Sequence, residues 1–187
     1  RAHIGVTNQQ GITFDGTIYK FGNPAGGSDT VTITATGTGQ VIDFTGGAAT
    51  TVASFGGNAA TAGNTITFAT GTIDLDDGSN LTIASDGGAI SVAGIRGDSS
   101  ETVTITANVT DGGDAQATET IALTGAIGNA DEIGAVTLNA NDGITMGGNI
   151  TLANSAGADL DINGKVFISG NVTIETDNAL DSGTHED

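Results

Sequence analysis

A short pattern with a glycine near its centre recurs along this chain and limits the folds that the chain can adopt. Its form is apolar-x-Gly-x-apolar-x-apolar, with tight copies that begin at Met146, Ile162 and Ile168 and looser ones that begin at Phe14 and Leu123. Apolar residues two apart point to the same face of a strand. Glycine accepts the backbone conformations that a sharp bend or bulge requires. Each copy therefore predicts two short strands hinged at a glycine.

Repetition of hinged strands is typical of a β-solenoid, in which each coil stacks on the next and buries one face. We expect residues 1–10 to form a lead-in strand, residues 11–176 the solenoid, and residues 177–187 an acidic, polar tail. The spacing of the predicted strands indicates about eight or nine coils, and hence a rod of roughly 40 Å at ~4.8 Å per coil.

Composition favours an all-β fold, a parallel β-helix. The chain of 187 residues has 31 Gly, one Pro and 4% aromatic residues. It is rich in Thr, Val and Ile, which favour strands, and poor in the strong helix formers. The alternative is a β-sandwich or jelly-roll filament subunit. A sandwich needs large side chains for a thick core, whereas the Val, Ile, Leu and Ala residues available here suit the thin interior of a solenoid.

The charge of the chain excludes several classes of partner. There are 22 Asp and Glu residues against four Lys and Arg, for a formal net charge of −18. Nucleic-acid binding needs a basic surface, so this class is excluded, and anionic membrane surfaces are disfavoured. No apolar run approaches the ~18 residues of a membrane span, so we expect no membrane insertion.

The absence of Cys is typical of an extracellular bacterial protein held together by stacking rather than by disulfides. The sequence opens on Arg1 without a Met, and we therefore expect a processed form or a segment of a longer protein.

Residues that could catalyse a reaction are not grouped in this sequence. No Gly-x-Ser-x-Gly, zinc-binding or phosphate-loop pattern occurs, and the two histidines, His3 and His185, stand near opposite ends of the chain. The plentiful carboxylates leave a two-carboxylate glycosidase as the remaining enzymatic alternative. We predict that the protein is not an enzyme.

One acidic stretch is a candidate calcium site. Asp74, Asp76, Asp77 and Asn80 place oxygen ligands around a glycine turn, as calcium-binding loops do. The stretch lacks the full spacing of an EF-hand loop and its distal Glu. An ordinary solvated turn built on Asp and Asn side chains is the structural alternative.

Threonines two apart occur at Thr30–Thr36, Thr65–Thr67 and Thr102–Thr106. A flat threonine array on a β-solenoid can order water and bind ice, but only where the threonines recur at the same place in successive coils. The intervals between these groups are irregular. This favours the interpretation that threonine serves here as an outward-facing strand former.

The segments Gly11–Ile18 and Gly143–Leu152 resemble the filamentous-haemagglutinin-like adhesins and related repeat-rich bacterial exoproteins. Leu123–Asn129 followed by Ile133–Leu138 is similar to a recurrent phrase in those proteins. The resemblance covers most of residues 11–176. It implies a right-handed parallel β-helix, secretion, and a role in adhesion, matrix or surface filaments.

These features predict an extracellular structural or adhesive protein at the bacterial cell surface, a stiff segment or subunit of a filament or adhesin. Open sheet edges at the ends of a solenoid invite pairing with another chain, and the segment around Ile4 and Val6 could supply such a strand to a second copy. The expected partner is the protein itself, with cell-surface glycans as a further class. The alternative is an extracellular module that binds calcium or glycans or, less strongly indicated, ice.

Overall fold

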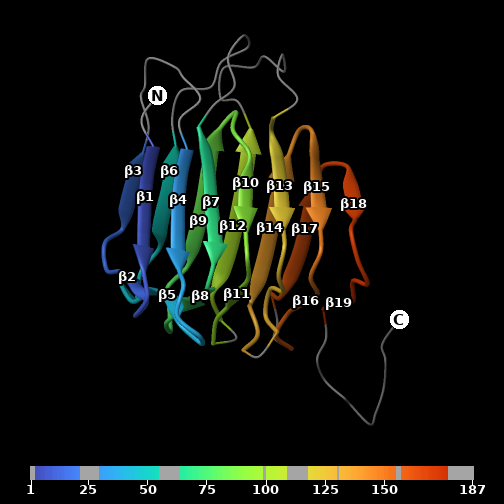
Figure 1. The fold of residues 1–187 in the computed structure, drawn as a ribbon. Coiled ribbons are helices and arrows are strands. Elements are labelled where there is room, and N and C mark those ends of the chain that lie inside the picture. Colours follow the sequence, from blue (N-terminus) through green and yellow to red (C-terminus); the bar gives the residue numbers. More distant parts are fainter. Residues whose placement is uncertain are drawn as a thin grey trace.

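The computed structural model describes residues 3–21, 30–54, 64–98, 100–108, 118–129, 131–154 and 157–176. Their regular secondary structure is β-strand throughout, and all strand pairs run parallel (Figure 1). The expected fold class, an all-β parallel β-helix, is confirmed. Within these ranges, the structure contains no helix that is long and apolar enough to cross a membrane.

Three sheets run along the solenoid, and the chain visits them in the fixed order A, B, C. Sheet A comprises, in spatial order, β1 (His3–Asn8), β4 (Thr30–Ala35), β7 (Thr65–Thr70), β10 (Ile90–Val92), β13 (Thr120–Leu123), β15 (Gly143–Met146) and β18 (Val166–Ile168). Sheet C comprises β3 (Ile18–Phe21), β6 (Thr50–Ser54), β9 (Leu81–Asp86), β12 (Thr102–Asn108), β14 (Ala135–Ala140) and β17 (Asp159–Asn163).

Sheet B is the shortest side of the coil. It comprises β2 (Ile12–Phe14), β5 (Val41–Phe44), β8 (Thr72–Leu75) and β11 (Ile95–Arg96), followed by the pair β16 (Ile150–Thr151) and β19 (Ile174–Glu175). Single parallel bridges from Ile127 to Ile95 and to Ile150 join the two groups. Sheet B therefore extends along the solenoid through the same coils as sheets A and C.

The described strands form seven coils, because sheet A has seven strands and each coil contributes one. The expected eight or nine coils were too many for this part of the chain. Seven coils are separated by six spacings of ~4.8 Å, which give a rod of roughly 29 Å. The glycine pattern marks corners rather than coils. Gly125 and Gly148 lie at the corner from sheet A to sheet B, Gly16 at the corner from B to C, and Gly164 at the corner from C to A. A complete coil has three strands and three corners, so the spacing of strands along the sequence does not by itself give the number of coils.

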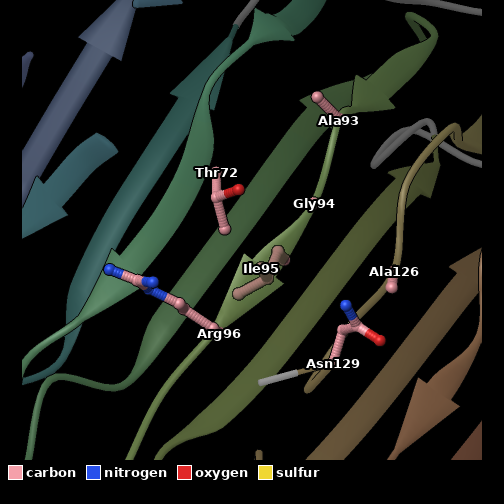
Figure 2. Close-up of a pocket in the computed structure, with 7 residues that line it drawn as sticks. All are labelled: Thr72, Ala93, Gly94, Ile95, Arg96, Ala126 and Asn129. Atoms are coloured by element: carbon pink, nitrogen blue, oxygen red, sulfur yellow. The ribbon is translucent and has the colours of Figure 1, made fainter. Parts of the chain in front are cut away.

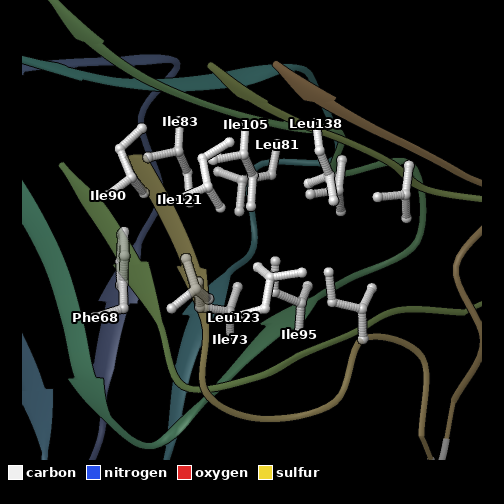
Figure 3. Packing of buried hydrophobic residues seen from close by; sticks show 14 of the residues in the cluster. Phe68, Ile73, Leu81, Ile83, Ile90, Ile95, Ile105, Ile121, Leu123 and Leu138 are labelled. Atoms are coloured by element: carbon white, nitrogen blue, oxygen red, sulfur yellow. The ribbon is translucent and has the colours of Figure 1, made fainter. Parts of the chain in front are cut away.

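Columns of identical or similar apolar side chains fill the interior. In sheet A, Ile90 lies in register between Ile66 and Ile121, and all three are fully buried. Sheets B and C carry equivalent columns, and Figure 3 shows Ile83, Ile105 and Leu138 of sheet C in a row across the interior from Ile73 and Ile95 of sheet B. Residues that alternate with these columns face outward. The core is thus a thin apolar layer shared by all coils.

Connections from sheet C to sheet A absorb the irregular spacing of the sequence. Residues 22–29, 55–63 and 109–117, which lie outside the described ranges, all fall between a sheet C strand and the next sheet A strand. Elsewhere the same connection is short, as between β14 and β15, where it consists of residues 141–142. Strands of consecutive coils therefore stay in register although the sequence intervals between them differ.

Substitution of a corner glycine tests how closely the coils approach one another. A Cβ atom on Gly125 would lie 1.5 Å from the carbonyl oxygen of Ala93 in the preceding coil, whereas one on Gly46 would lie 3.7 Å from its nearest neighbour, the carbonyl oxygen of Asp15. We expect Gly125→Ala to lower the free energy of unfolding by more than ~1 kcal/mol and Gly46→Ala to leave it nearly unchanged. Urea denaturation measures both. Equal midpoints for the two variants would contradict the corner geometry.

Candidate functional site

Charged side chains gather on sheet B and on the corner that leads from sheet B to sheet C. Asp43 lies in register with Asp74, and Asp74 with Arg96, so the three form one outward-facing column. Nη2 of Arg96 donates a 2.5 Å hydrogen bond to Oδ2 of Asp74. Nε of Arg96 lies 3.9 Å from Oδ2 of Asp131 on the other side. One guanidinium thus stands between carboxylates of the preceding and the following coil.

This charged column changes the pKa of two of its members. The hydrogen bond to Asp74 raises the pKa of Arg96, an effect that burial opposes and the nearby negative charges reinforce. Burial raises the pKa of Asp43, and the negative charges of Asp74 and Asp76 raise it further, while Arg96 lowers it. Asp43 therefore lies mainly beside other negative charges, and the positive charge of Arg96 offsets only part of the repulsion between them.

A shallow cleft of about 170 Å³ opens beside the column (Figure 2). It exists because two small residues, Gly94 and Ala126, occupy the corner from sheet A to sheet B in consecutive coils. The remaining lining residues are Thr72, Ala93, Ile95, Arg96 and Asn129. Arg96 is the one charged residue of this lining, and it is already paired with Asp74. The cleft offers hydrogen-bonding groups without a reactive centre.

The residues predicted to bind calcium do not converge in the structure. Asp74 points along sheet B to Arg96, and the side-chain oxygen of Asn80 accepts a 2.7 Å hydrogen bond from the backbone nitrogen of Thr102 in the next coil. Asp76 and Asp77 lie in the turn between them. Over the described ranges, no group of three or more His, Cys, Asp or Glu side chains is arranged to hold a metal ion. Two of the four predicted ligands thus link coils instead.

Sequence reasoning missed a fully buried carboxylate at the same corner, that of Glu101. One oxygen, Oε2, accepts hydrogen bonds from the backbone nitrogens of Asp98 at 2.5 Å and Ser100 at 3.3 Å. The other, Oε1, accepts from the Ser100 hydroxyl at 2.8 Å and from the backbone nitrogen of Gly78 at 3.0 Å. Because Gly78 belongs to the preceding coil, Glu101 ties two consecutive corners together.

The hydrogen bonds to Glu101 decide its protonation state. Burial by itself raises the pKa of this carboxyl, but the bonds from Asp98, Ser100 and Gly78 outweigh burial and hold the pKa below its ordinary value. Its charged form is therefore part of the fold. The signal in the sequence is an acidic residue that closes a short polar turn immediately before a strand, at residues 97–101.

Ile4 and Val6, the predicted self-assembly residues, belong to β1 at one edge of sheet A. This strand pairs with β4 of the same chain, with Val6 opposite Ile33. The segment is thus already used in its own solenoid, and what it offers a second copy is its other edge, which has no strand beside it in the described part of the chain. Aromatic rings pack near this end, where Phe14 stacks on Phe44 and meets Tyr19 edge to face, both at centroid distances of 4.8 Å.

The opposite end of the solenoid exposes apolar side chains. Val166 and Ile168 of β18 lie in register with Ile144 and Met146 and so continue inward-facing columns. Ile144 and Met146 are 0% exposed, whereas Val166 is 44% and Ile168 is 56% exposed. Ile174 of β19 is likewise 45% exposed. Side chains suited to a core therefore lie at the surface in the last described coil.

Comparison with known proteins assigns this chain to no family. No family model, no curated protein and no solved structure matches it. The structure supports the coarser part of the resemblance noted above, an all-β solenoid of parallel strands, and the adhesin family itself stays a hypothesis.

The buried carboxylate of Glu101 predicts a pH-dependent contribution to stability. Its pKa is lower in the folded than in the unfolded state, so its contribution is full above the ordinary pKa of glutamate and is lost as pH falls through the folded value. We expect Glu101→Gln to lower the free energy of unfolding by about 1–3 kcal/mol at pH 7, and the difference from the unmodified protein to shrink towards pH 3. Denaturation curves across this pH range measure it.

Glu175→Gln is the matched control, because Glu175 is exposed on β19. Its effect on stability should be small at every pH. If Glu101→Gln behaved in the same way, the four hydrogen bonds would not be stabilising the charged form.

Proposed function

We propose that this chain is a stiff segment or subunit of an extracellular bacterial surface filament or adhesin, and that it associates with further copies through the open ends of its solenoid. The observation that carries this proposal is the last described coil, where Val166, Ile168 and Ile174 occupy inward columns and yet are about half exposed. Apolar surface in such a position gains free energy when another coil covers it.

A second copy fits this end because the first coil of one copy can stack on the last described coil of another. The free edge of β18 and the free edge of β1 both belong to sheet A, and their strands run in the same direction (Figure 1). Stacking β1 of one copy on β18 of another continues the parallel ladder of backbone hydrogen bonds. The two ends differ, so the contact is head to tail, and a head-to-tail contact that does not close a ring produces a filament.

The surface charge is compatible with a structural role outside the cell. A net charge of −18 keeps individual rods apart in solution. Neither the charged column on sheet B nor the cleft beside it brings together a nucleophile, a general base and a binding site. A mechanical function therefore accounts for more of the observed features than catalysis does. Localisation at the bacterial surface rests on the resemblance in sequence.

Substitution of one exposed apolar residue at the joint tests this assembly. Ile168→Lys places a charge in an inward column of the last coil, and we expect it to abolish the filaments or oligomers that the unmodified protein forms at micromolar concentration. Negative-stain electron microscopy and light scattering after size exclusion report the result. The matched control is Thr104→Lys, because Thr104 faces outward in the middle of sheet C, away from both ends of the solenoid. Assemblies that survive Ile168→Lys, or an unmodified protein that stays monomeric, would reject end-to-end association.

A further inference from the structure

The outward face of sheet A is uncharged in a strongly acidic protein. None of its strands contains Asp, Glu, Lys or Arg within the bounds that the structure describes. Sheets B and C both carry charge, for example Asp74 and Arg96 in B and Lys20 and Asp161 in C. With 22 acidic residues in the chain, this segregation separates one face from the rest of the surface.

Hydroxyl side chains occupy four of the six positions in the central outward column of this neutral face. The central outward column runs through Gly5, Thr32, Thr67, Ser91, Ala122 and Thr145 in six consecutive strands. Beside it, Thr30 lies opposite Thr65. Thr-x-Thr groups that are separated by irregular intervals in the sequence thus meet in space. The irregular intervals lie in the connections between strands and not in the strands of the sheet. This is why the sequence favoured the interpretation that threonine is an outward-facing strand former.

A β-bulge preserves the threonine array where the strands would otherwise lose it. The pairing of β4 with β7 shifts by one residue after Ile33, so that Thr34 lies opposite Thr70 instead of Ala69. Thr7 of β1 lies opposite Thr34 on the other side. Bulges commonly re-aim a side chain, and this one places a third threonine column next to the other two.

The dimensions of this array are fixed by the backbone. Neighbouring strands lie ~4.8 Å apart, and alternate residues along a strand lie ~6.6 Å apart. Threonine is branched at Cβ and has few χ1 rotamers, so each hydroxyl and methyl group has a restricted position. The face therefore presents hydroxyl and methyl groups on a rigid two-dimensional lattice.

A lattice of this kind suits a ligand that is itself periodic and uncharged. Ice offers a repeating set of hydrogen-bond donors and acceptors, and water ordered by the threonine hydroxyls loses little further entropy when it joins the crystal. Crystalline polysaccharides are also periodic, but flat sugar rings are best covered by aromatic side chains. Among the outward residues of the described sheet A strands, the one aromatic is Phe167 in the last strand. We propose that the outward face of sheet A, centred on Thr32 and Thr67, binds ice.

Partition into growing ice tests this proposal. A dilute solution of the unmodified chain is frozen slowly around a cold probe, and the protein is measured in the ice and in the remaining liquid. We expect enrichment in the ice, together with thermal hysteresis. Thr67→Lys puts a charge between Thr32 and Ser91 in the centre of the face, and we expect it to bring partition down to that of an inert protein and to remove hysteresis.

Thr104→Lys is the matched control. Thr104 is half-buried like Thr67 and lies between Thr82 and Thr137 in the outward column of sheet C. Circular dichroism establishes that both variants are folded. Retained activity in Thr104→Lys with loss in Thr67→Lys supports the assignment. The proposal is overturned by exclusion of the unmodified protein from ice, by equal loss in both variants, or by loss in Thr104→Lys alone. Binding to crystalline polysaccharide without partition into ice also overturns it.

Discussion

The parallel ladder between consecutive coils is the constraint on which the rest of this structure depends. Such a ladder places equivalent residues of neighbouring strands side by side, so each column collects one residue from every coil. Extra residues in a connection leave the ladder intact, whereas an extra residue inside a strand forces a bulge, as it does after Ile33. Variation in the chain is therefore concentrated between sheets C and A, and the apolar columns inside stay aligned.

Alignment has a cost for charged residues, because like charges in neighbouring strands of one column repel each other. Two arrangements in the structure reduce this repulsion. Arg96 stands beside Asp74 in the column that also holds Asp43, and Glu101 is held by four hydrogen-bond donors of two corners. Most of the other acidic residues that the structure describes lie in turns or at strand ends. The two arrangements explain how a chain with a net charge of −18 forms a stacked fold.

The sequence could predict the fold because both of its signals are local. Alternation such as that of residues 30–35 depends only on the pleat of a strand, and the glycine hinges depend only on backbone freedom. The number of coils could not be predicted in the same way, because the spacing of strands does not say how many strands make one coil. The structure has three, separated by corners such as those at Gly16, Gly148 and Gly164. The hydrogen-bond partners of Asp74 and Asn80 could not be predicted from the sequence either. Each contacts a residue 22 positions away, at a register that only the lengths of the connections determine.

The same register links the two proposals for this molecule. If copies stack end to end with the ladder continued from β18 to β1, the outward columns of sheet A continue as well, and the threonine face of one copy is followed by that of the next. Adsorption to a periodic solid then becomes multivalent, so that each added copy binds at the high effective concentration set by the joint. Phe167 and Gly5 would be neighbours at that joint, where the array carries no hydroxyl. A filament would therefore present separated threonine patches of equal size, and its affinity would grow with the number of copies and not with the continuity of the face.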